Sequence, residues 1–332
     1  MKKILFYILF FLVFSGCKKP NETAFYFWKT TYKISAYEKD YLDKLQVTKL
    51  YVRFFDIDLK EYQPVPVGEI DIQEKNTTQE IIPVIFITNE TFKYLDKTAI
   101  AQLANNTLQE IKFIYPKISN QKIKEIQFDC DWTVTTRNKY FYFINLVKAL
   151  SPEIIFSATI RLHQIKYKNT AGVPTAHKGV LMYYATENPL KATDKNSILD
   201  NEEAAKYIKN INQYPIHLDI AMPIYSWAII ENELGEKRLV NGIREDDLQD
   251  TSLYFKTAKS SFIIKKEHTL NGLYVQQDFK IKTEEITTDD LLLAKKNILS
   301  KLKNKELTTI FYQLDSSNLK HYSINELNAI SK

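Results

Sequence analysis

The feature that most constrains this chain is a repeated alternation of short apolar segments with amphipathic helical stretches. Segments such as VIFI, IIFSATI and LDIAMPI are almost continuously apolar, which is typical of parallel strands covered on both faces. Stretches with apolar residues at three- and four-residue spacing lie between them and predict helices at 36–45, 98–115, 140–150 and 201–212. The eight predicted strands are Phe25–Thr30, Lys49–Asp56, Ile82–Thr88, Glu125–Asp131, Ile154–His163, Gly179–Ala185, Ile216–Pro223 and Thr308–Asp315.

This number of strand–helix units favours an α/β fold of the closed (β/α)8 TIM-barrel type, formed as a single domain by residues 25–332. An open doubly wound sheet is the alternative, and it would bind a ligand at a switch point in the strand order. About 85 residues separate the last two predicted strands. They predict an insertion at about 232–305, with apolar segments at Ser261–Ile264 and Gly272–Ile281 and a helix at 288–303.

The start of the chain has the pattern of a targeting signal. Two lysines precede an apolar run of eleven residues, Ile4–Phe14, which is too short to span a bilayer but fits a secretory signal. The following Phe14-Ser15-Gly16-Cys17 resembles a bacterial lipoprotein processing site. The resemblance implies that 1–16 is a signal peptide, that Cys17 is lipidated, that 17–24 is a tether, and that the protein is anchored in the cell envelope. A secreted protein with an incidental Cys17 is the alternative.

Several function classes are excluded by composition and by missing motifs. The chain has only 7 glycines in 332 residues and no GxGxxG or GxxxxGK[ST], so nucleotide-binding loops of those kinds are absent. It also lacks GxSxG and HExxH, the motifs of serine hydrolases and zincins. The formal net charge is +5 without a basic run interleaved with aromatics, so we expect no nucleic-acid partner. We also expect no cofactor and no metal centre.

Charged side chains gather at the carboxyl ends of the predicted strands, where TIM barrels carry their active sites. Asp129 and Asp131 are two apart on one strand and therefore point to the same face. Two carboxylates that close raise one pKa and can supply an acid and a base. The alternative is that one caps a loop and the other pairs with Arg161 or Arg53.

Other candidates share these strand ends. Arg161 and His163 lie on one face of their strand and could clamp an anionic group or a sugar hydroxyl, or could pair with the aspartates. Asp219 lies inside an apolar strand and needs a buried partner, so structural and catalytic roles are both open. The candidate sugar-stacking rings are Trp132, Tyr184, Tyr225 and Trp227, and core or rim packing is the more common role for any single one of them.

Two short stretches resemble a known family. Asp129-Cys130-Asp131-Trp132-Thr133 resembles the fourth-strand DxDxE motif of chitinase-type glycosidases, and Met182-Tyr183-Tyr184 is similar to their MxY element. The resemblance implies a (β/α)8 barrel and a carbohydrate ligand. In that family the last residue of the DxDxE motif is the glutamate that protonates the leaving oxygen. Here the position is Thr133, so the resemblance implies either an acid elsewhere or a loss of that chemistry.

Longer stretches resemble a set of Bacteroidota lipoproteins with a glycosidase-like barrel. The likeness is carried by FDCDWT, SATIRLHQIKY, GVLMYY and YPIHLDIAMPIYSW. This second resemblance implies the barrel fold and an envelope location, and it implies no particular reaction.

Two hypotheses of function follow. The first is a cell-envelope glycoside hydrolase in which Asp131 is the acid, Asp129 its partner or the base, and Asp219 or Asp315 a more distant second carboxylate. The second is a non-catalytic barrel that binds a glycan or an envelope partner, and Thr133 supports it. The predicted substrate-binding residues are Arg53, Trp132, Arg161, His163, Tyr184, Tyr225, Trp227 and Asp315.

Overall fold

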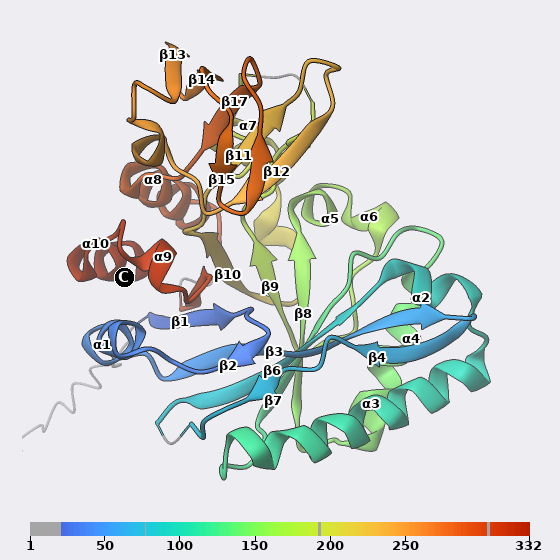
Figure 1. The fold of residues 1–332 in the computed structure, drawn as a ribbon. Helices are drawn as coiled ribbons and strands as arrows, with labels where there is room; N and C mark the ends of the chain where they lie inside the picture. The colour runs from blue at the N-terminus through green and yellow to red at the C-terminus, as the bar shows by residue number, and fades with distance from the viewer. Residues whose placement is uncertain (1–20, 77, 192–193, 304–305) are drawn as a thin grey trace, which may run out of the picture.

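A computed structural model describes residues 21–76, 78–191, 194–303 and 306–332. Eight parallel strands form a closed barrel (Figure 1), because β1 pairs with β18 on one side and with β3 on the other. The closed ring confirms the predicted (β/α)8 barrel and excludes the open sheet. The barrel strands are β1 (Glu22–Phe27), β3 (Lys49–Lys60), β6 (Glu80–Ile87), β7 (Glu125–Asp129), β8 (Ile155–Arg161), β9 (Lys178–Met182), β10 (His217–Pro223) and β18 (Thr308–Tyr312).

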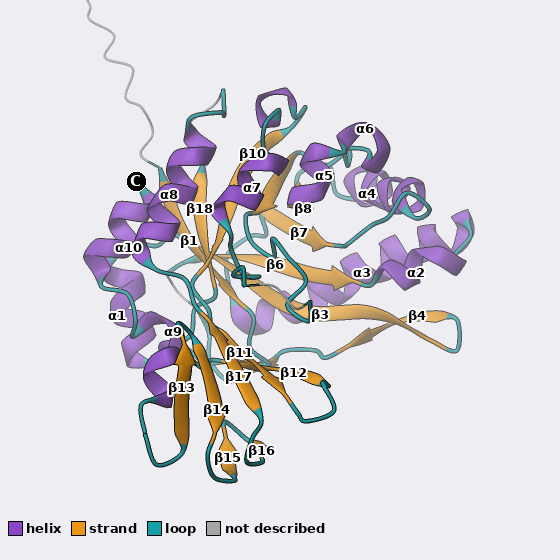
Figure 2. Cartoon of the chain, turned by 90° about the horizontal axis from the view of Figure 1, so that it is seen from above, coloured by secondary structure: helices purple, strands orange, loops and turns teal. Residues whose placement is uncertain are grey.

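Helices surround the barrel, as the view from above shows (Figure 2). Their starts carry local signals: Ser35 and Glu38 form a capping box on the first helix, and Asp96 caps the longest one. Their apolar faces bury the outer side of the barrel in the main hydrophobic core. The helices are α1 (Ala36–Lys44), α2 (Asn89–Tyr94), α3 (Lys97–Ile118), α4 (Arg137–Leu150), α5 (Leu162–Lys166), α6 (Lys168–Ala171), α7 (Asn201–Tyr207), α8 (Thr288–Leu299), α9 (Ser316–Leu319) and α10 (Ile324–Ser331).

The barrel interior is filled with side chains. A second core cluster of inward-pointing residues includes Tyr26, Tyr51, Val84 and Ile310, all fully buried. The Tyr26 hydroxyl donates a hydrogen bond of 2.6 Å to Gln127 Oε1 inside this core. A binding site can therefore lie only at an end of the barrel.

Asp219 lies at the amino-terminal end of the barrel, in a buried ionic network. Lys178 Nζ is 2.9 Å from both Glu125 Oε2 and Asp219 Oδ2. Asp219 Oδ1 accepts the Thr308 backbone N–H at 2.8 Å and lies 3.2 Å from His217 Nε2. Burial opposes the charge of Asp219, but His217 and Lys178 outweigh it and hold its pKa well below the usual range. Asp219 is therefore not placed for the predicted catalytic role. It lies at the amino-terminal end of the barrel, and its buried hydrogen bonds and ion pair give it a structural role.

The predicted insertion is an antiparallel sheet that stands above the barrel (Figure 1). It has its own small core, which includes Ile230, Phe262 and Ile264. The sheet begins at Trp227 and ends at Glu284, whereas α8 joins the helical ring of the barrel, so the insertion is shifted from the expected 232–305. Its strands, in spatial order, are β12 (Lys237–Asn241), β11 (Trp227–Glu231), β17 (Lys280–Glu284), β14 (Ser261–Ile264) and β13 (Tyr254–Ala258), with a separate hairpin of β15 (His268–Leu270) and β16 (Leu273–Val275).

Three short strands extend the lower part of the molecule. β4 (Gln63–Val67) pairs with the long β3 in a hairpin, and β2 (Thr31–Tyr32) pairs with β5 (Asp71–Ile72). The predicted signal peptide 1–16 and Cys17 lie outside the described residues. Within the described part of the chain, none of the helices has the length and apolar character needed to cross a membrane.

Lys295 on α8 is buried with uncharged partners. Its Nζ lies 2.6 Å from Thr309 Oγ1 and 2.9 Å from the carbonyl oxygen of Ser331. Burial lowers the pKa of Lys295 to about 8. The unfolded chain therefore holds this proton more tightly than the folded protein, and stability rises as the pH increases from about 8 toward 10.5.

We expect Lys295→Met to raise the free energy of unfolding at pH 7 by about 1–2 kcal/mol, because it removes the cost of burying the ammonium group. Thr309 Oγ1 lies 3.3 Å from the Ser331 carbonyl and keeps a partner. Urea unfolding at pH 7, 8.5 and 10 measures the effect, with the exposed neighbour Lys296→Met as the control. A Lys295→Met variant that is less stable than the wild type at every pH would contradict this expectation.

Candidate functional site

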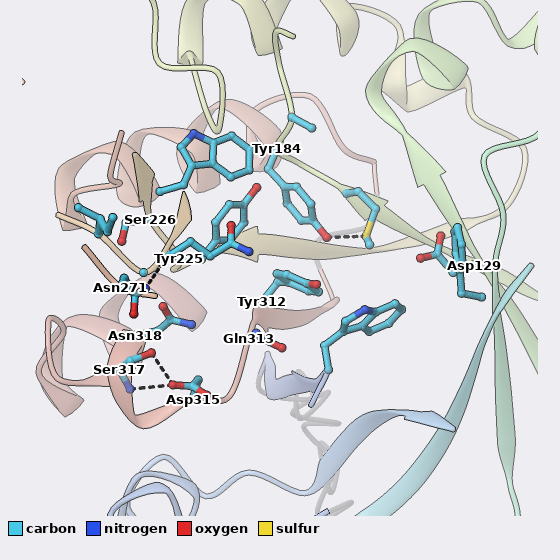
Figure 3. A pocket seen from close by; sticks show the side chains of 18 of the residues that line it. Asp129, Tyr184, Tyr225, Ser226, Asn271, Tyr312, Gln313, Asp315, Ser317 and Asn318 are labelled. Atoms are coloured by element: carbon cyan, nitrogen blue, oxygen red, sulfur yellow. Dashed lines mark hydrogen bonds between the residues drawn. The ribbon is translucent and has the colours of Figure 1, made fainter. Parts of the chain in front are cut away.

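A cavity of about 1020 Å³ lies at the carboxyl end of the barrel, beneath the insertion sheet (Figure 3). Barrel strands and the loops after them supply its floor and one wall, and the insertion supplies the other wall through Asn241, Asp247 and Asn271. The lining residues used below are Trp28, Asp56, Asp129, Asp131, Arg161, Tyr184, Tyr225, Trp227, Asn241, Asp247, Asn271, Tyr312, Gln313 and Asp315.

Five aromatic side chains form what we call the aromatic wall: Trp28, Tyr184, Tyr225, Trp227 and Tyr312. The rings of Tyr184 and Tyr225 both lie 5.8 Å from that of Tyr312, centroid to centroid. The Trp28 ring lies 5.9 Å from Tyr312, and the Trp227 ring lies 5.4 Å from Tyr225. Such rings offer flat apolar surface with polar tips. The wall contains the predicted Tyr184, Tyr225 and Trp227.

Asp129 lies on the cavity floor and is almost fully buried. Its Oδ1 accepts a hydrogen bond of 2.6 Å from Thr159 Oγ1. Burial raises the pKa of Asp129, and the nearby Arg161 guanidinium only partly opposes that shift. Asp129 is therefore a carboxyl group whose protonated form is favoured by its surroundings.

Asp131 is paired with Arg161. Arg161 Nε donates to Asp131 Oδ1 at 2.5 Å, and Arg161 Nη2 donates to Asp131 Oδ2 at 3.1 Å. Burial disfavours the guanidinium charge, but Asp129 and Asp131 together outweigh it and raise the pKa of Arg161. The structure thus brings Asp129, Asp131 and Arg161 together, and it shows the ion pair that was the alternative to catalysis for Asp131.

Thr133 has an environment unlike that of a general acid. It is exposed, and its hydroxyl lies 2.9 Å from Thr135 Oγ1 and 3.3 Å from Thr136 Oγ1 in the turn before α4. A threonine hydroxyl in such a turn has no ionisable proton to give near neutral pH.

Two predicted residues, Arg53 and Trp132, have other roles. Arg53 donates to Asp56 from Nε at 2.7 Å and from Nη2 at 2.6 Å. Asp56 lines the cavity, whereas Arg53 does not line it and serves to orient Asp56. Gly68 makes room for this pair, since a side chain there would lie 2.7 Å from the Arg53 guanidinium. Trp132 is buried beside Tyr140, and its indole N–H donates to the Ala171 carbonyl at 2.9 Å. The expectation that Trp132 stacks on a sugar is therefore wrong, because its indole belongs to the core.

Asp315 and His163 lie at the edges of the site. Asp315 caps α9 by accepting the Ser317 backbone N–H at 2.8 Å, and its other oxygen is 3.4 Å from Lys29 Nζ. Burial opposes its charge, but Ser317 and Lys29 lower the pKa of Asp315 overall. His163 lies outside the main cavity, in an adjoining groove, where burial lowers its pKa.

Sequence reasoning missed Trp28, Tyr312 and Asp56, together with the wall from the insertion. Trp28 lies within the first predicted strand and Tyr312 within the last, so the strand-end rule could have found both. Asn241 ends strand β12 of the insertion and Asn271 lies in the turn between β15 and β16, so neither carries the signal of a barrel strand end. Their place depends on how the insertion packs over the barrel.

Glu284 holds Trp227 in place. This buried carboxylate accepts the Trp227 indole N–H at 2.8 Å and the Ser197 backbone N–H at 3.0 Å, both at Oε2. Its Oε1 accepts from Lys282 Nζ at 2.8 Å. Glu284 therefore ties the insertion strand β17 to the aromatic wall and to the loop before α7.

We expect Glu284→Ala to lower the free energy of unfolding by about 2–3 kcal/mol, because it leaves the buried donors on Trp227 and Ser197 unpaired. Glu284→Gln keeps one acceptor oxygen and should cost less. Urea unfolding of both variants tests this, and Glu233→Ala on the exposed turn of the insertion is the matched control. Equal decreases in the free energy of unfolding for Glu284→Ala and Glu233→Ala would show that the Glu284 carboxylate does not stabilise the fold through Trp227 and Ser197.

Among the described residues, histidine, cysteine and carboxylate side chains form no group of three or more that could hold a metal ion. The site within that part of the chain is built from aromatic rings, ion-paired carboxylates and amides.

Comparison with solved structures supports the barrel fold. The Bacillus cereus spore cortex-lytic enzyme SleL is similar with a TM-score of 0.55 and 13% identity, covering 95% of this chain and 75% of that one. Catalytic domain 2 of Ostrinia furnacalis Group II chitinase (E2180L mutant), in complex with (NAG)5, is similar with a TM-score of 0.56 and 10% identity, covering 93% of this chain and 95% of that one. A Chromobacterium violaceum chitinase has a TM-score of 0.51 and 12% identity, covering 92% of this chain and 98% of that one. No protein-family model and no curated protein sequence matches the chain.

Proposed function

We propose that this protein is a glycan-binding barrel of the cell envelope, which holds neutral sugar rings against the aromatic wall without chitinase-type hydrolysis. The observation that carries the proposal is the combination of the five-ring aromatic wall in the cavity with Thr133 at the position of the acidic glutamate in the DxDxE motif. The names of similar structures support a carbohydrate ligand, since one is a chitinase solved with (NAG)5 and another a chitinase solved with allosamidin.

A polar ligand also suits the floor of the cavity. The side-chain oxygen of Gln313 is buried and has no hydrogen-bond partner among the described residues, and Gln313 lines the cavity. Buried acceptors in folded proteins are nearly always satisfied. A hydroxyl or amide N–H of a bound sugar would supply the missing donor.

The carboxylates of the cavity support binding over turnover. Asp56 is held by Arg53, Asp131 by Arg161, and Asp315 by Lys29 and its helix cap. In the common two-carboxylate mechanism, a glycosidase needs one carboxyl group free to protonate the leaving oxygen and a second to act on the other side of the bond. Three of the cavity carboxylates are instead engaged in ion pairs.

The predicted lipid anchor fits the direction in which the cavity opens. Glu22 starts β1 at the amino-terminal end of the barrel, where it accepts from Thr308 Oγ1 beside the Asp219 network. The cavity lies at the opposite end. A lipidated Cys17 would therefore tether the barrel to the membrane by the end that faces away from the glycan site.

Hydrolysis with Asp129 as the acid is the second candidate, and the raised pKa of Asp129 favours it. A general acid needs a carboxyl group whose pKa is raised above its ordinary value, and Asp129 has this property. Under this candidate, Asp129→Asn abolishes turnover of a glycan that the variant still binds.

The proposal is tested by calorimetric titration of the soluble protein, residues 21–332, with chitooligosaccharides of increasing length. We expect saturable binding that strengthens until the aromatic wall is filled and then levels off. Chromatography of the same mixtures should show oligosaccharides of unchanged length after prolonged incubation. Shortened products that disappear in Asp129→Asn would favour the hydrolase, and the absence of binding to any length would overturn the proposal.

A further inference from the structure

A side groove adjoins the main cavity across the Asp131–Arg161 ion pair. It has a volume of about 430 Å³ and shares Asp131, Arg161, Tyr184 and Ala185 with the main cavity. Its own lining is completed by Leu162, His163, Thr186 and Tyr207. A ligand that crosses the ion pair would therefore occupy both spaces.

The charges of the two spaces differ. The main cavity is lined by five aspartates. Asp56, Asp131 and Asp315 are paired with Arg53, Arg161 and Lys29, whereas Asp129 and Asp247 form no ion pair of their own among the described residues. The side groove is lined by Asp131, Arg161 and His163, so its carboxylate is matched by the guanidinium that binds it. An anionic group would be repelled in the main cavity and less so in the side groove.

A lysine lies beside one of the rings that line the side groove. Lys166 Nζ lies 5.0 Å from the centre of the Tyr207 ring and 5.1 Å from that of Tyr167. These contacts hold the ammonium group over the ring that lines the groove. Arg161 uses its Nε and Nη2 for Asp131, and its Nη1 has no hydrogen-bond partner among the described residues.

We infer that the side groove binds a carboxylate substituent of the glycan, so that the ligand is an acidic glycan with a neutral sugar in the main cavity and its acid group beside Arg161, His163 and Lys166. This inference rests on the proposed function, because it assumes that sugar rings occupy the main cavity. A lactyl ether on an amino sugar and a hexuronic acid both present such a carboxylate, and the test separates them.

The experiment is calorimetric titration with three glycans of equal length. One is a neutral chitotetraose, one carries lactyl ethers on alternate sugars, and one carries hexuronic acids. At low ionic strength we expect at least one acidic glycan to bind about tenfold more tightly than the neutral one, as a partly exposed charge pair can provide. The glycan that shows the gain identifies the source of the carboxylate, and the gain should shrink at 0.5 M salt.

The variant Lys166→Glu should abolish the gain and leave the affinity for chitotetraose unchanged, because Lys166 does not line the main cavity. Lys209→Glu, an exposed position beyond the end of α7, makes the same charge change away from the groove and is the matched control. Lys166→Arg should keep the gain.

Equal affinity of the wild type for neutral and acidic glycans would overturn the inference and leave the proposed function intact. Persistence of the gain in Lys166→Glu would also overturn it, because the carboxylate would then lie elsewhere. Failure of every glycan to bind would overturn both the inference and the proposed function.

Discussion

Arg161→Met is expected to lower the free energy of unfolding by about 2–4 kcal/mol at pH 7. The arginine is the cation shared by Asp129 and Asp131, and Asp129 is almost fully buried. Without it, Asp129 keeps Thr159 as its hydrogen-bond donor while the negative charge of Asp131 stays nearby. Because Asp131 and Arg161 are partly exposed, the loss should fall below that of a fully buried pair.

The loss should also depend on pH. Burial already raises the pKa of Asp129 in the folded protein, and removal of the guanidinium raises it further. A carboxyl group with a raised folded pKa costs stability as the pH rises through that pKa, since the folded state must give up its proton. The deficit of Arg161→Met should therefore be smallest near pH 4 and largest near pH 7. Urea unfolding across this range measures it.

Arg238→Met, on an exposed strand of the insertion, is the control for the loss of one surface arginine and should change stability by less than about 0.5 kcal/mol. If the loss of stability in Arg161→Met did not vary between pH 4 and 7, the Arg161 guanidinium would not affect the pKa of Asp129.

Tyr312→Ala is expected to weaken binding of chitooligosaccharides by about 30- to 100-fold, the cost of removing a central aromatic contact. The Tyr312 ring lies within 6 Å of the rings of Trp28, Tyr184 and Tyr225, so its loss opens the middle of the aromatic wall. Tyr312→Phe keeps the ring and should retain most of the affinity. Calorimetric titration of both variants gives the ratio.

Tyr312→Ala also removes buried contacts of the ring, so the stability of this variant must be measured together with its affinity. Tyr274→Ala removes an exposed tyrosine from the insertion hairpin, outside the cavity, and should bind as the wild type does. If a folded Tyr312→Ala variant bound glycans with wild-type affinity, the aromatic wall would not be the binding surface.

The barrel was predictable because its strands are buried on both faces. Near-continuous apolar runs such as those of β6 and β10 distinguish such strands from surface elements, and all eight appear at the predicted places. The proximity of Asp129 and Asp131 at the mouth was also predictable, because Asp129 ends β7 and Asp131 follows two residues later at the same end of the barrel.

Distance along the barrel axis was harder to predict than the direction of a side chain. Asp219 and Asp129 both point inward, yet Asp219 bonds Lys178 at the amino end while Asp129 lies under the cavity. Position within the strand sets this height: Asp219 is the third residue of β10, whereas Asp129 is the last residue of β7. Trp132 was misplaced for a related reason, since its burial comes from α4 packing over the turn that follows β7.

The central claim is that the mouth cavity binds a glycan and leaves it intact. The most direct measurement is the mass of a chitohexaose recovered from its complex with the protein after separation from free sugar and overnight incubation. We expect one bound oligosaccharide per chain, at its full mass. Recovery of shortened sugars from the wild type, or of no bound sugar at all, would contradict the claim.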